Sequence, residues 1–213
     1  MATTDKKSDA TIRRLSKYHR TLELALQQHK RTLSSEQIAQ ENKLTAAQVR
    51  KDLSYFGAFG RRGLGYNVAS LHETISRLLG LNKLWNVALV GVGNIGRALV
   101  AYDGFRQRGF HIKLLLDSDD KKIGHKIHDL TIYPLSESSL LIPRLGIKIA
   151  ILAVPAEAAQ HAADEMIAAG AKAILNFAPV TLQVSPGIFV RQENMAFEIE
   201  SLSFLLTNEQ RTT

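Results

Sequence analysis

One short run of glycines limits the folds open to this chain more than any other feature of its sequence. The apolar run Trp85–Val90 ends directly before Gly91, Gly93 and Gly96, and a helical stretch follows to about Tyr102. Glycines at this spacing permit a tight turn and a close approach of a helix to a strand. The run therefore predicts a buried strand, a turn and a helix, which together form the first unit of a parallel α/β sheet.

The segments downstream continue the alternation of apolar strands and amphipathic helices. We expect strands at residues 111–116, 147–154 and 171–177, and a helix at 156–169. Strands separated by helices are typical of a parallel sheet with both faces covered. Residues 83–190 are therefore predicted to form a Rossmann-like domain.

The glycine turn is also a candidate dinucleotide site. Gly91 would make the turn, Gly93 would let the backbone approach a pyrophosphate, and Gly96 would let the helix pack closely on the strand. The start of the helix would offer N–H groups to the phosphates. The predicted binding residues of this loop are Gly91, Val92, Gly93, Asn94, Ile95 and Gly96. Because three glycines can fall at this spacing by chance, a Rossmann-like sheet with a vestigial loop is the alternative.

An acidic residue lies where a dinucleotide site needs one. Asp117 follows the second expected strand and comes 21 residues after Gly96. A carboxylate in that place accepts hydrogen bonds from the adenosine ribose hydroxyls and repels a 2′-phosphate. The sequence therefore favours NADH and NAD⁺ over the 2′-phosphorylated cofactors, although Lys121 and Lys122 lie nearby.

Later strand ends are expected to surround the rest of the ligand. Val154 and Pro155 follow one expected strand, and Asn176 and Phe177 end another. Open α/β sheets bind their ligands at the carboxyl ends of the strands. These four residues are therefore predicted to contact the ligand, with ordinary turn chemistry as the alternative for Pro155.

The basic charge of the chain is concentrated in its first 80 residues. That part holds 14 Lys and Arg against 7 Asp and Glu, whereas the rest holds 13 of each. The excess indicates a polyanion-binding module joined to a neutral domain, or else a solvated basic face. Because the sequence has no cysteine and no apolar signal-like stretch after Met1, we expect a cytoplasmic protein without disulfides or a membrane span.

The basic end has the pattern of a winged helix-turn-helix. Two short helices, expected at 35–42 and 46–56, are each preceded by a capping residue. Four glycines within residues 57–65 predict a tight hairpin after them. Residues 1–82 are therefore predicted to form a DNA-binding domain.

The second of these helices would enter the major groove of double-stranded DNA. Gln can pair there with adenine, and Arg or Lys with guanine, while hydroxyl groups suit phosphate oxygens. Arginines at the hairpin tip would reach the minor groove or the backbone. The predicted DNA-binding residues are Gln48, Arg50, Lys51, Ser54, Tyr55, Arg61 and Arg62. The alternative for Arg50 and Lys51 is a solvated helix face.

Candidates for catalysis are scarce. The histidines His111, His125, His128 and His161 lack triad or metal partners. His125 and His128 have a spacing that could ligate a metal, but they lie in a polar loop. The Rossmann-like part also leaves no room for a substrate domain. We therefore expect no catalytic residue, no metal and no enzymatic activity, and we infer that the ligand is sensed.

Several separate motifs are similar to those of one known family. They are Gln48-Val49-Arg50-Lys51-Asp52-Leu53-Ser54-Tyr55-Phe56-Gly57, Gly63-Leu64-Gly65-Tyr66, the 91–96 loop, Tyr102-Asp103-Gly104-Phe105 and Asn176-Phe177-Ala178-Pro179. In these motifs the chain resembles the Rex family of redox-sensing transcriptional repressors, from about residue 10 to 206. The resemblance implies a homodimer, a palindromic operator, and release of the operator when NADH binds.

The resemblance also assigns roles to single residues. Arg50, Lys51, Ser54 and Arg62 match DNA-contacting positions of the family. Residues 197–206 match a helix swapped onto the partner subunit, so residues 191–213 are expected to form the swapped segment. Tyr102 matches a tyrosine near the nicotinamide. The 91–96 loop and Asp117 match the dinucleotide site.

One departure from the family pattern concerns the switch between states. Family members commonly carry an Asp that pairs alternately with the equivalents of Arg20 and Tyr102. That position is Asn194 here, which can still form hydrogen bonds but loses the ionic part of a pairing with Arg20. The predicted switch residues are therefore Arg20, Tyr102 and Asn194.

Two other functions are compatible with parts of the sequence. A small NAD-dependent oxidoreductase with a basic interaction module would turn over a 2-hydroxy acid or an alcohol. A DNA-binding protein with another ligand is the second alternative, because related Rossmann domains bind coenzyme A. Asp117 argues against coenzyme A.

Overall fold

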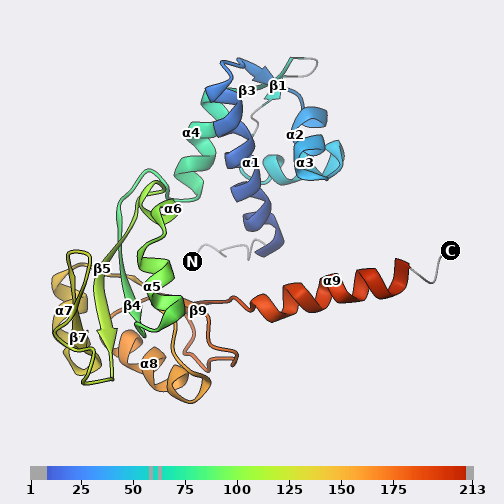
Figure 1. The fold of residues 1–213 in the computed structure, drawn as a ribbon. Helices are drawn as coiled ribbons and strands as arrows, with labels where there is room; N and C mark the ends of the chain where they lie inside the picture. The colour runs from blue at the N-terminus through green and yellow to red at the C-terminus, as the bar shows by residue number, and fades with distance from the viewer. Residues whose placement is uncertain (1–8, 58–59, 62–63, 210–213) are drawn as a thin grey trace. The chain divides into compact units, whose positions relative to one another are not determined.

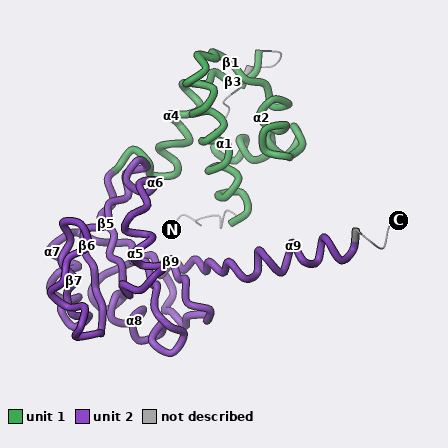
Figure 2. Tube along the Cα trace, in the orientation of Figure 1, with its two compact units in different colours: residues 1–83 green, residues 84–213 purple. Residues whose placement is uncertain are grey.

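The computed structural model describes residues 9–57, 60–61 and 64–209. The chain divides into two compact units, residues 1–83 and 84–213, which we call unit 1 and unit 2 (Figure 2). Among the described residues, no helix has both the length and the apolar character needed to cross a membrane.

Unit 1 combines helices with a small antiparallel sheet. The helices are α1 (Asp9–Gln27), α2 (Ser35–Asn42), α3 (Ala46–Ser54) and α4 (Val68–Leu78) (Figure 1). The strands are β1 (Thr32–Leu33), β2 (Gly60–Arg61) and β3 (Gly65–Asn67), arranged in the order β1-β3-β2. The pairing of β2 with β3 forms the hairpin that the glycines predict, next to a helix-turn-helix made of α2 and α3.

Local capping fixes the two short helices of unit 1. Ser34 and Gln37 form a reciprocal capping box at the start of α2, and Lys43 ends that helix with a left-handed φ of 54°. Thr45 then accepts a hydrogen bond from the backbone N–H of Gln48 and starts α3. These caps explain why two helices form with only three residues between them.

The core of unit 1 is built from the apolar stripes of its four helices. Its fully or nearly fully buried members include Leu15, Tyr18, Leu22, Ile38, Val49, Leu53, Leu71 and Ile75. The apolar residues of α3 recur at four-residue spacing, so one face of α3 lies on the core and the other is solvated.

Unit 2 contains a seven-stranded sheet. Its strands are β4 (Trp85–Val90), β5 (Phe110–Asp117), β6 (Lys126–Ile127), β7 (Leu130–Pro134), β8 (Ile149–Leu152), β9 (Ala173–Asn176) and β10 (Phe189–Gln192). Their order is β10-β9-β8-β4-β5-β7-β6, and all neighbours are parallel except β6 and β7. The strand order reverses between β4 and β8, which is the topological switch point of a Rossmann-like fold.

Helices cover both faces of this sheet. They are α5 (Asn94–Val100), α6 (Asp103–Arg106), α7 (Ser138–Arg144) and α8 (Ala156–Ala168), with the short 3₁₀ helix η1 (Leu135–Glu137) before α7. Along β4, Ala88 and Val90 pack into the core that α7 and α8 share. The alternate residues Val87 and Leu89 pack with residues of α5 and α6 on the other face. The α/β fold class with a Rossmann-like sheet is therefore confirmed.

The last helix of unit 2 exposes its apolar side chains. This helix is α9 (Met195–Glu209; red in Figure 1). Phe197, Ile199, Leu202 and Phe204 are each 60% exposed or more. So large an apolar surface is unusual for a subunit that acts alone.

The structure differs from the sequence-based expectations in several places. The third helix of unit 1 ends at Ser54 and not at Phe56, because Tyr55 caps it before Gly57 adopts a φ of 135°. The helix expected to reach Tyr102 ends at Val100, and α6 follows it. The segment from β6 to α7 and strand β10 were not expected, and β6 makes the sheet mixed and not purely parallel.

Candidate nucleotide pocket and DNA-reading helix

The glycine loop after β4 has the geometry that its sequence predicts. Gly91 adopts a φ of 90°, and a Cβ there would lie 2.5 Å from the carbonyl oxygen of Ala153. A Cβ on Gly96 would lie 2.1 Å from the carbonyl oxygen of Gly91, so only glycine allows α5 to approach the turn. Gly93 has open space where its Cβ would be. The loop is thus tightly packed on one side and open at Gly93.

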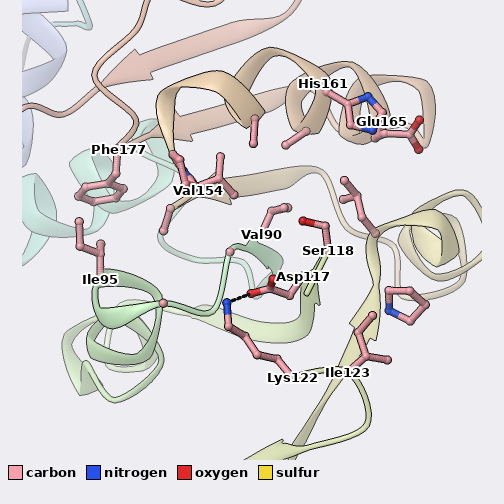
Figure 3. A pocket seen from close by; sticks show the side chains of 18 of the residues that line it. Val90, Ile95, Asp117, Ser118, Lys122, Ile123, Val154, His161, Glu165 and Phe177 are labelled. Atoms are coloured by element: carbon pink, nitrogen blue, oxygen red, sulfur yellow. Dashed lines mark hydrogen bonds and ion pairs between the residues drawn. The ribbon is translucent and has the colours of Figure 1, made fainter. Parts of the chain in front are cut away.

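Asp117 closes this loop from the end of β5. Its Oδ2 accepts hydrogen bonds from the Val92 N–H at 2.7 Å and from the Lys122 ammonium at 3.1 Å, the latter drawn in Figure 3. Its Oδ1 accepts one from the Asp119 N–H at 3.0 Å. Burial opposes ionisation, but these hydrogen bonds outweigh it and lower the pKa of Asp117. The carboxylate is therefore anionic at neutral pH and borders the open side of the loop.

A cavity of about 780 Å³ lies at the carboxyl ends of β4, β5, β8 and β9. Its volume is within the size range of small-molecule sites. Figure 3 shows the Asp117–Lys122 pair on one side of it and Ile95 and Phe177 together on another. The predicted cofactor residues that line the cavity are Gly91, Gly93, Asn94, Ile95, Asp117, Val154, Pro155 and Phe177. The ends of four strands, β4, β5, β8 and β9, thus bring residues that are distant in sequence to one pocket.

Four predicted cofactor residues do not line this cavity. Val92 is buried and holds Asp117 through its N–H, and Gly96 packs against Gly91. Asn176 is fully buried; its amide donates to the carbonyl oxygens of Ala178 and Val180 and to the Gln192 side chain. These three residues shape the walls of the pocket without facing it.

The fourth, Tyr102, lies in a separate hollow. Its ring meets Phe105 edge-on with centroids 5.2 Å apart, and it is 59% exposed. The ring covers Gly104, where a Cβ would come within 2.4 Å of it. The pocket residues of this single chain therefore do not include the tyrosine that we expect near the nicotinamide.

Sequence reasoning missed one wall of the pocket. This wall is lined by Ser118, Asp120 and Ile123 after β5, by Pro134 at the end of β7 with Leu135 and Ser136 after it, and by Ala158, His161, Ala162 and Glu165 of α8. The segment between β5 and α7 has no recognisable motif. The residues of α8 that line the pocket recur at helical spacing, so they share one face of the helix. The sequence alone does not show that this face borders the pocket.

The DNA-binding residues predicted on α3 differ in the hydrogen bonds that their side chains form. The Arg50 guanidinium donates to the Ser35 hydroxyl at 2.9 Å and to the Glu36 carboxylate at 3.2 Å, both on α2. Lys51 and Tyr55 are exposed, and the Ser54 hydroxyl donates to the Lys51 carbonyl oxygen at 2.7 Å. Four of the predicted residues thus lie on the solvated face of α3.

The remaining predicted DNA-binding residues are Gln48, Arg61 and Arg62. Gln48 is only partly exposed, and its amide donates to Asp52 at 2.8 Å. Arg61 lies in β2 of the hairpin, whereas Arg62 lies outside the described residues.

A buried carboxylate on α3 was missed by sequence reasoning. Asp52 accepts hydrogen bonds from Arg14 and Tyr18 of α1 and from Gln48. Burial opposes ionisation of Asp52, but these bonds outweigh it and lower its pKa, and burial in turn raises the pKa of the Tyr18 phenol. The spacing of Arg14 and Tyr18, one helical turn apart, is the signal that could have indicated a shared polar partner.

The predicted switch residues belong to both units. Arg20 is exposed on α1 of unit 1. Asn194 precedes α9 in unit 2, where its side-chain oxygen accepts a hydrogen bond from the Ala196 N–H at 3.0 Å. Asn194 therefore acts as a local cap for α9 in this structure.

Comparisons with known proteins agree with both halves of this description. The sequence model of the family described as "CoA binding domain" matches residues 82–180, and that of "Putative DNA-binding protein N-terminus" matches residues 6–54. The first match spans the residues that line the cavity described above.

The full chain is similar to curated repressors. It is 45% identical over 210 residues to the redox-sensing transcriptional repressor Rex of Chloroflexus aurantiacus, covering 99% of each chain. It is 46% identical over 196 residues to Rex of Carboxydothermus hydrogenoformans, covering 92% of this chain and 94% of the relative.

Solved structures of a Rex-family repressor, RSP, have the same fold. RSP in complex with β-NAD⁺ and operator DNA matches with a TM-score of 0.90 and 36% identity, over 96% of this chain and 94% of RSP. RSP in complex with β-NADH matches with a TM-score of 0.87 and 35% identity, over 96% of each chain. The resemblance seen in the sequence motifs is confirmed: this chain belongs to the Rex family of redox-sensing transcriptional repressors.

Proposed function

We propose that this chain represses transcription by binding operator DNA and that NADH releases it. The observation that carries the proposal is a nucleotide-sized pocket with an anionic Asp117 in a chain whose other unit is a basic helix-turn-helix. Relatives with this arrangement are named as redox-sensing repressors, and RSP has been crystallised with β-NAD⁺, β-NADH and operator DNA. The protein is a sensor and not an oxidoreductase.

The ligand of the pocket is NADH or NAD⁺. Asp117 would accept hydrogen bonds from the adenosine ribose hydroxyls, and Gly93 leaves the room that a pyrophosphate needs. Pro155, Val154 and Phe177 would enclose the nicotinamide end. The family match to a CoA-binding domain keeps coenzyme A as a second candidate ligand, and an anionic Asp117 disfavours its 3′-phosphate.

The DNA partner is a double-stranded operator read by α3. Arg50, Lys51 and Gln48 would contact bases, while Ser54, Tyr55, Arg61 and Arg62 would contact the backbone or the minor groove. Because one helix reads only a few base pairs, a symmetric dimer and a palindromic operator would supply the required length.

The dimer would form through the C-terminal helix. The apolar side chains of α9 are exposed along its length and need a partner surface. The division into residues 1–82 for DNA, 83–190 for NAD(H) and 191–213 for dimerisation follows from this assignment. Arg20, Tyr102 and Asn194 would form the switch between the bound and the released state, and the protein would act in the cytoplasm.

A direct binding experiment tests this function. A duplex is first selected from a random pool by the wild-type chain, and its affinity is then measured by fluorescence anisotropy with NADH, NAD⁺, coenzyme A or no ligand. We expect NADH to weaken binding most and coenzyme A to have no effect. Equal affinities in all four conditions would contradict the sensor, and failure to enrich any sequence would contradict the repressor.

A further inference from the structure

The buried carboxylate of α3, on Asp52, has all of its hydrogen-bonding capacity filled by side chains. Asp52 is fully buried, and its two oxygens accept four hydrogen bonds. Oδ1 accepts from Arg14 Nη2 at 2.8 Å and from Gln48 Nε2 at 2.8 Å, while Oδ2 accepts from Arg14 Nε and from the Tyr18 hydroxyl at 2.8 Å. Arg14 thus binds the carboxylate with two parallel hydrogen bonds.

The hydrogen-bond network around Asp52 joins α1 to α3, the helix proposed to read DNA, and its geometry depends on the orientation of both helices. Backbone packing in unit 1 is close between α1 and α4, α1 and α2, and α2 and α3, but sparse between α1 and α3. Val49 and Leu53 hold α3 on the core by apolar contacts, which do not fix its rotation. A two-point contact between guanidinium and carboxylate does fix it, because the planar fork allows one orientation.

The network also holds a residue at the edge of the reading face. Gln48 lies one turn before Asp52 on α3 and is half-buried, between the core stripe and the exposed residues. One amide hydrogen of Gln48 is committed to Asp52. Among the described residues, no other hydrogen bond engages the rest of that amide, so its oxygen and second hydrogen are available to a base edge.

Stability alone does not account for such a pair. Replacing a buried ion pair with apolar side chains of similar volume is often neutral or stabilising, because the charges no longer need to be desolvated. Arg50 also ties α3 to α2, but an apolar core at position 52 would remove the directional contact between α3 and α1 and leave Gln48 free to change rotamer. What the ion pair adds is a fixed orientation of α3 against α1.

We infer that Arg14 and Asp52 are positioning residues for operator reading: they fix the rotation of α3 and orient the Gln48 amide toward one base. Neither residue contacts DNA in this assignment. The inference rests on the proposed function, because it concerns how selectively the operator is read.

The test is a double substitution that removes the pair without changing the net charge. Arg14→Met with Asp52→Leu deletes one cation and one anion, so electrostatic attraction to DNA stays equal. Lys17→Gln with Glu23→Gln is the matched control, since both residues are exposed on α1. Each full-length variant is assayed for thermal unfolding, for NADH affinity by fluorescence, and for affinity to the selected duplex and to a scrambled duplex of equal composition.

We expect the Arg14→Met/Asp52→Leu variant to lose selectivity while it remains folded. Its ratio of selected to scrambled affinity should fall by about ten-fold, the size of one lost base contact. Affinity for the scrambled duplex and for NADH should stay at the wild-type values. Adding Gln48→Ala to this variant should change selectivity little further, because both changes remove the same contact.

If the folded double variant keeps wild-type selectivity, the pair is only structural and the inference is wrong. Arg14→Lys provides a second test should the double variant unfold: it keeps the charge but loses the two-point contact, and we expect a several-fold loss of selectivity. Wild-type selectivity in Arg14→Lys would also overturn the inference. If the wild-type chain bound the selected and the scrambled duplex equally well, the proposed function itself would be contradicted.

Discussion

Unit 1 and unit 2 each bury a carboxylate beside a functional surface, but the two carboxylates are held in different ways. Asp52 is fully buried and accepts hydrogen bonds only from side chains, among which Arg14 contributes two. Asp117 accepts from two backbone N–H groups and from Lys122, which is 31% exposed. Asp52 is thus enclosed by protein side chains, whereas Asp117 has one partner, Lys122, that is partly exposed to solvent.

The difference indicates what each carboxylate does. A carboxylate whose hydrogen-bonding capacity is filled by buried side chains joins two helices and has no capacity left for a ligand. A carboxylate anchored by the backbone at the rim of a pocket can exchange one lysine for ligand hydroxyls. We therefore assign Asp52 to the architecture of DNA reading and Asp117 to ligand binding, and four substitutions test that contrast.

The largest effect is expected at the loop that anchors Asp117. In Gly96→Ala the new Cβ would lie 2.1 Å from the Gly91 carbonyl oxygen, so the loop must distort and unit 2 should lose about 4 kcal/mol of unfolding free energy. Gly93→Ala is the matched control, because nothing lies within 4 Å of its Cβ. It should leave stability unchanged yet weaken NADH binding at least ten-fold by occupying the space of the pyrophosphate. Equal melting temperatures for the two variants would contradict this reading of the loop.

The next effect concerns Asp52. Asp52→Asn replaces an acceptor with an amide whose N–H₂ group faces the donors of Arg14, so the free energy of unfolding of unit 1 should fall by about 3 kcal/mol. NADH affinity should not change, since Asp52 lies in the other unit. Denaturant titration with a fluorescence assay for NADH checks both statements. A variant with wild-type stability would show that the network is not needed for folding.

Substitution of Asp117 should have the reverse profile. In Asp117→Asn the side-chain oxygen can still accept from the Val92 N–H, and only the bonds from the Asp119 N–H and Lys122 are lost, so stability should fall by less than in Asp52→Asn. NADH affinity should fall about ten-fold with the loss of charge-assisted hydrogen bonds to the ribose, while NADPH affinity should rise because repulsion of its 2′-phosphate is removed. Titration calorimetry with both cofactors measures this. If Asp117→Asn lowered the free energy of unfolding as much as Asp52→Asn does, the assignment of different roles to the two carboxylates would be wrong.

The smallest effect is on the pH dependence of stability. The pKa of Asp52 is lowered in the folded state, so its contribution is present above the unfolded value of about 3.9 and is lost as the pH falls through the folded value. The stability difference between wild type and Asp52→Asn should therefore be constant near neutral pH and narrow below about pH 4. A difference that does not vary down to pH 3 would show that the ionised form is not what stabilises unit 1.

The parts of the fold set by local patterns were predictable from the sequence. Capping at Ser34 and Thr45 and the apolar run before Gly91 depend on neighbouring residues, and the structure has those elements at the expected places. By contrast, the segment containing β6, β7 and α7 has no cap motif or clear period, and its structure depends on pairing with the sheet.

The candidate sites were predictable to the same extent. The loop and Asp117 follow from one motif and its spacing, so sequence placed them in a common site. Asn176 does not line the pocket, because a side chain at a strand end can face either the ligand or its own turn, and only packing decides between them. Asp52 was overlooked because its partners on α1 are 34 and 38 residues away in sequence.

In the proposed function, one chain couples a nucleotide pocket to DNA reading, and coupling between two binding sites must be reciprocal. The most direct measurement is the Kd for NADH with and without saturating operator duplex. We predict that the operator weakens NADH binding by the same factor by which NADH weakens operator binding, about 5- to 150-fold for typical coupling. An NADH affinity that is unaffected by the operator would contradict the account.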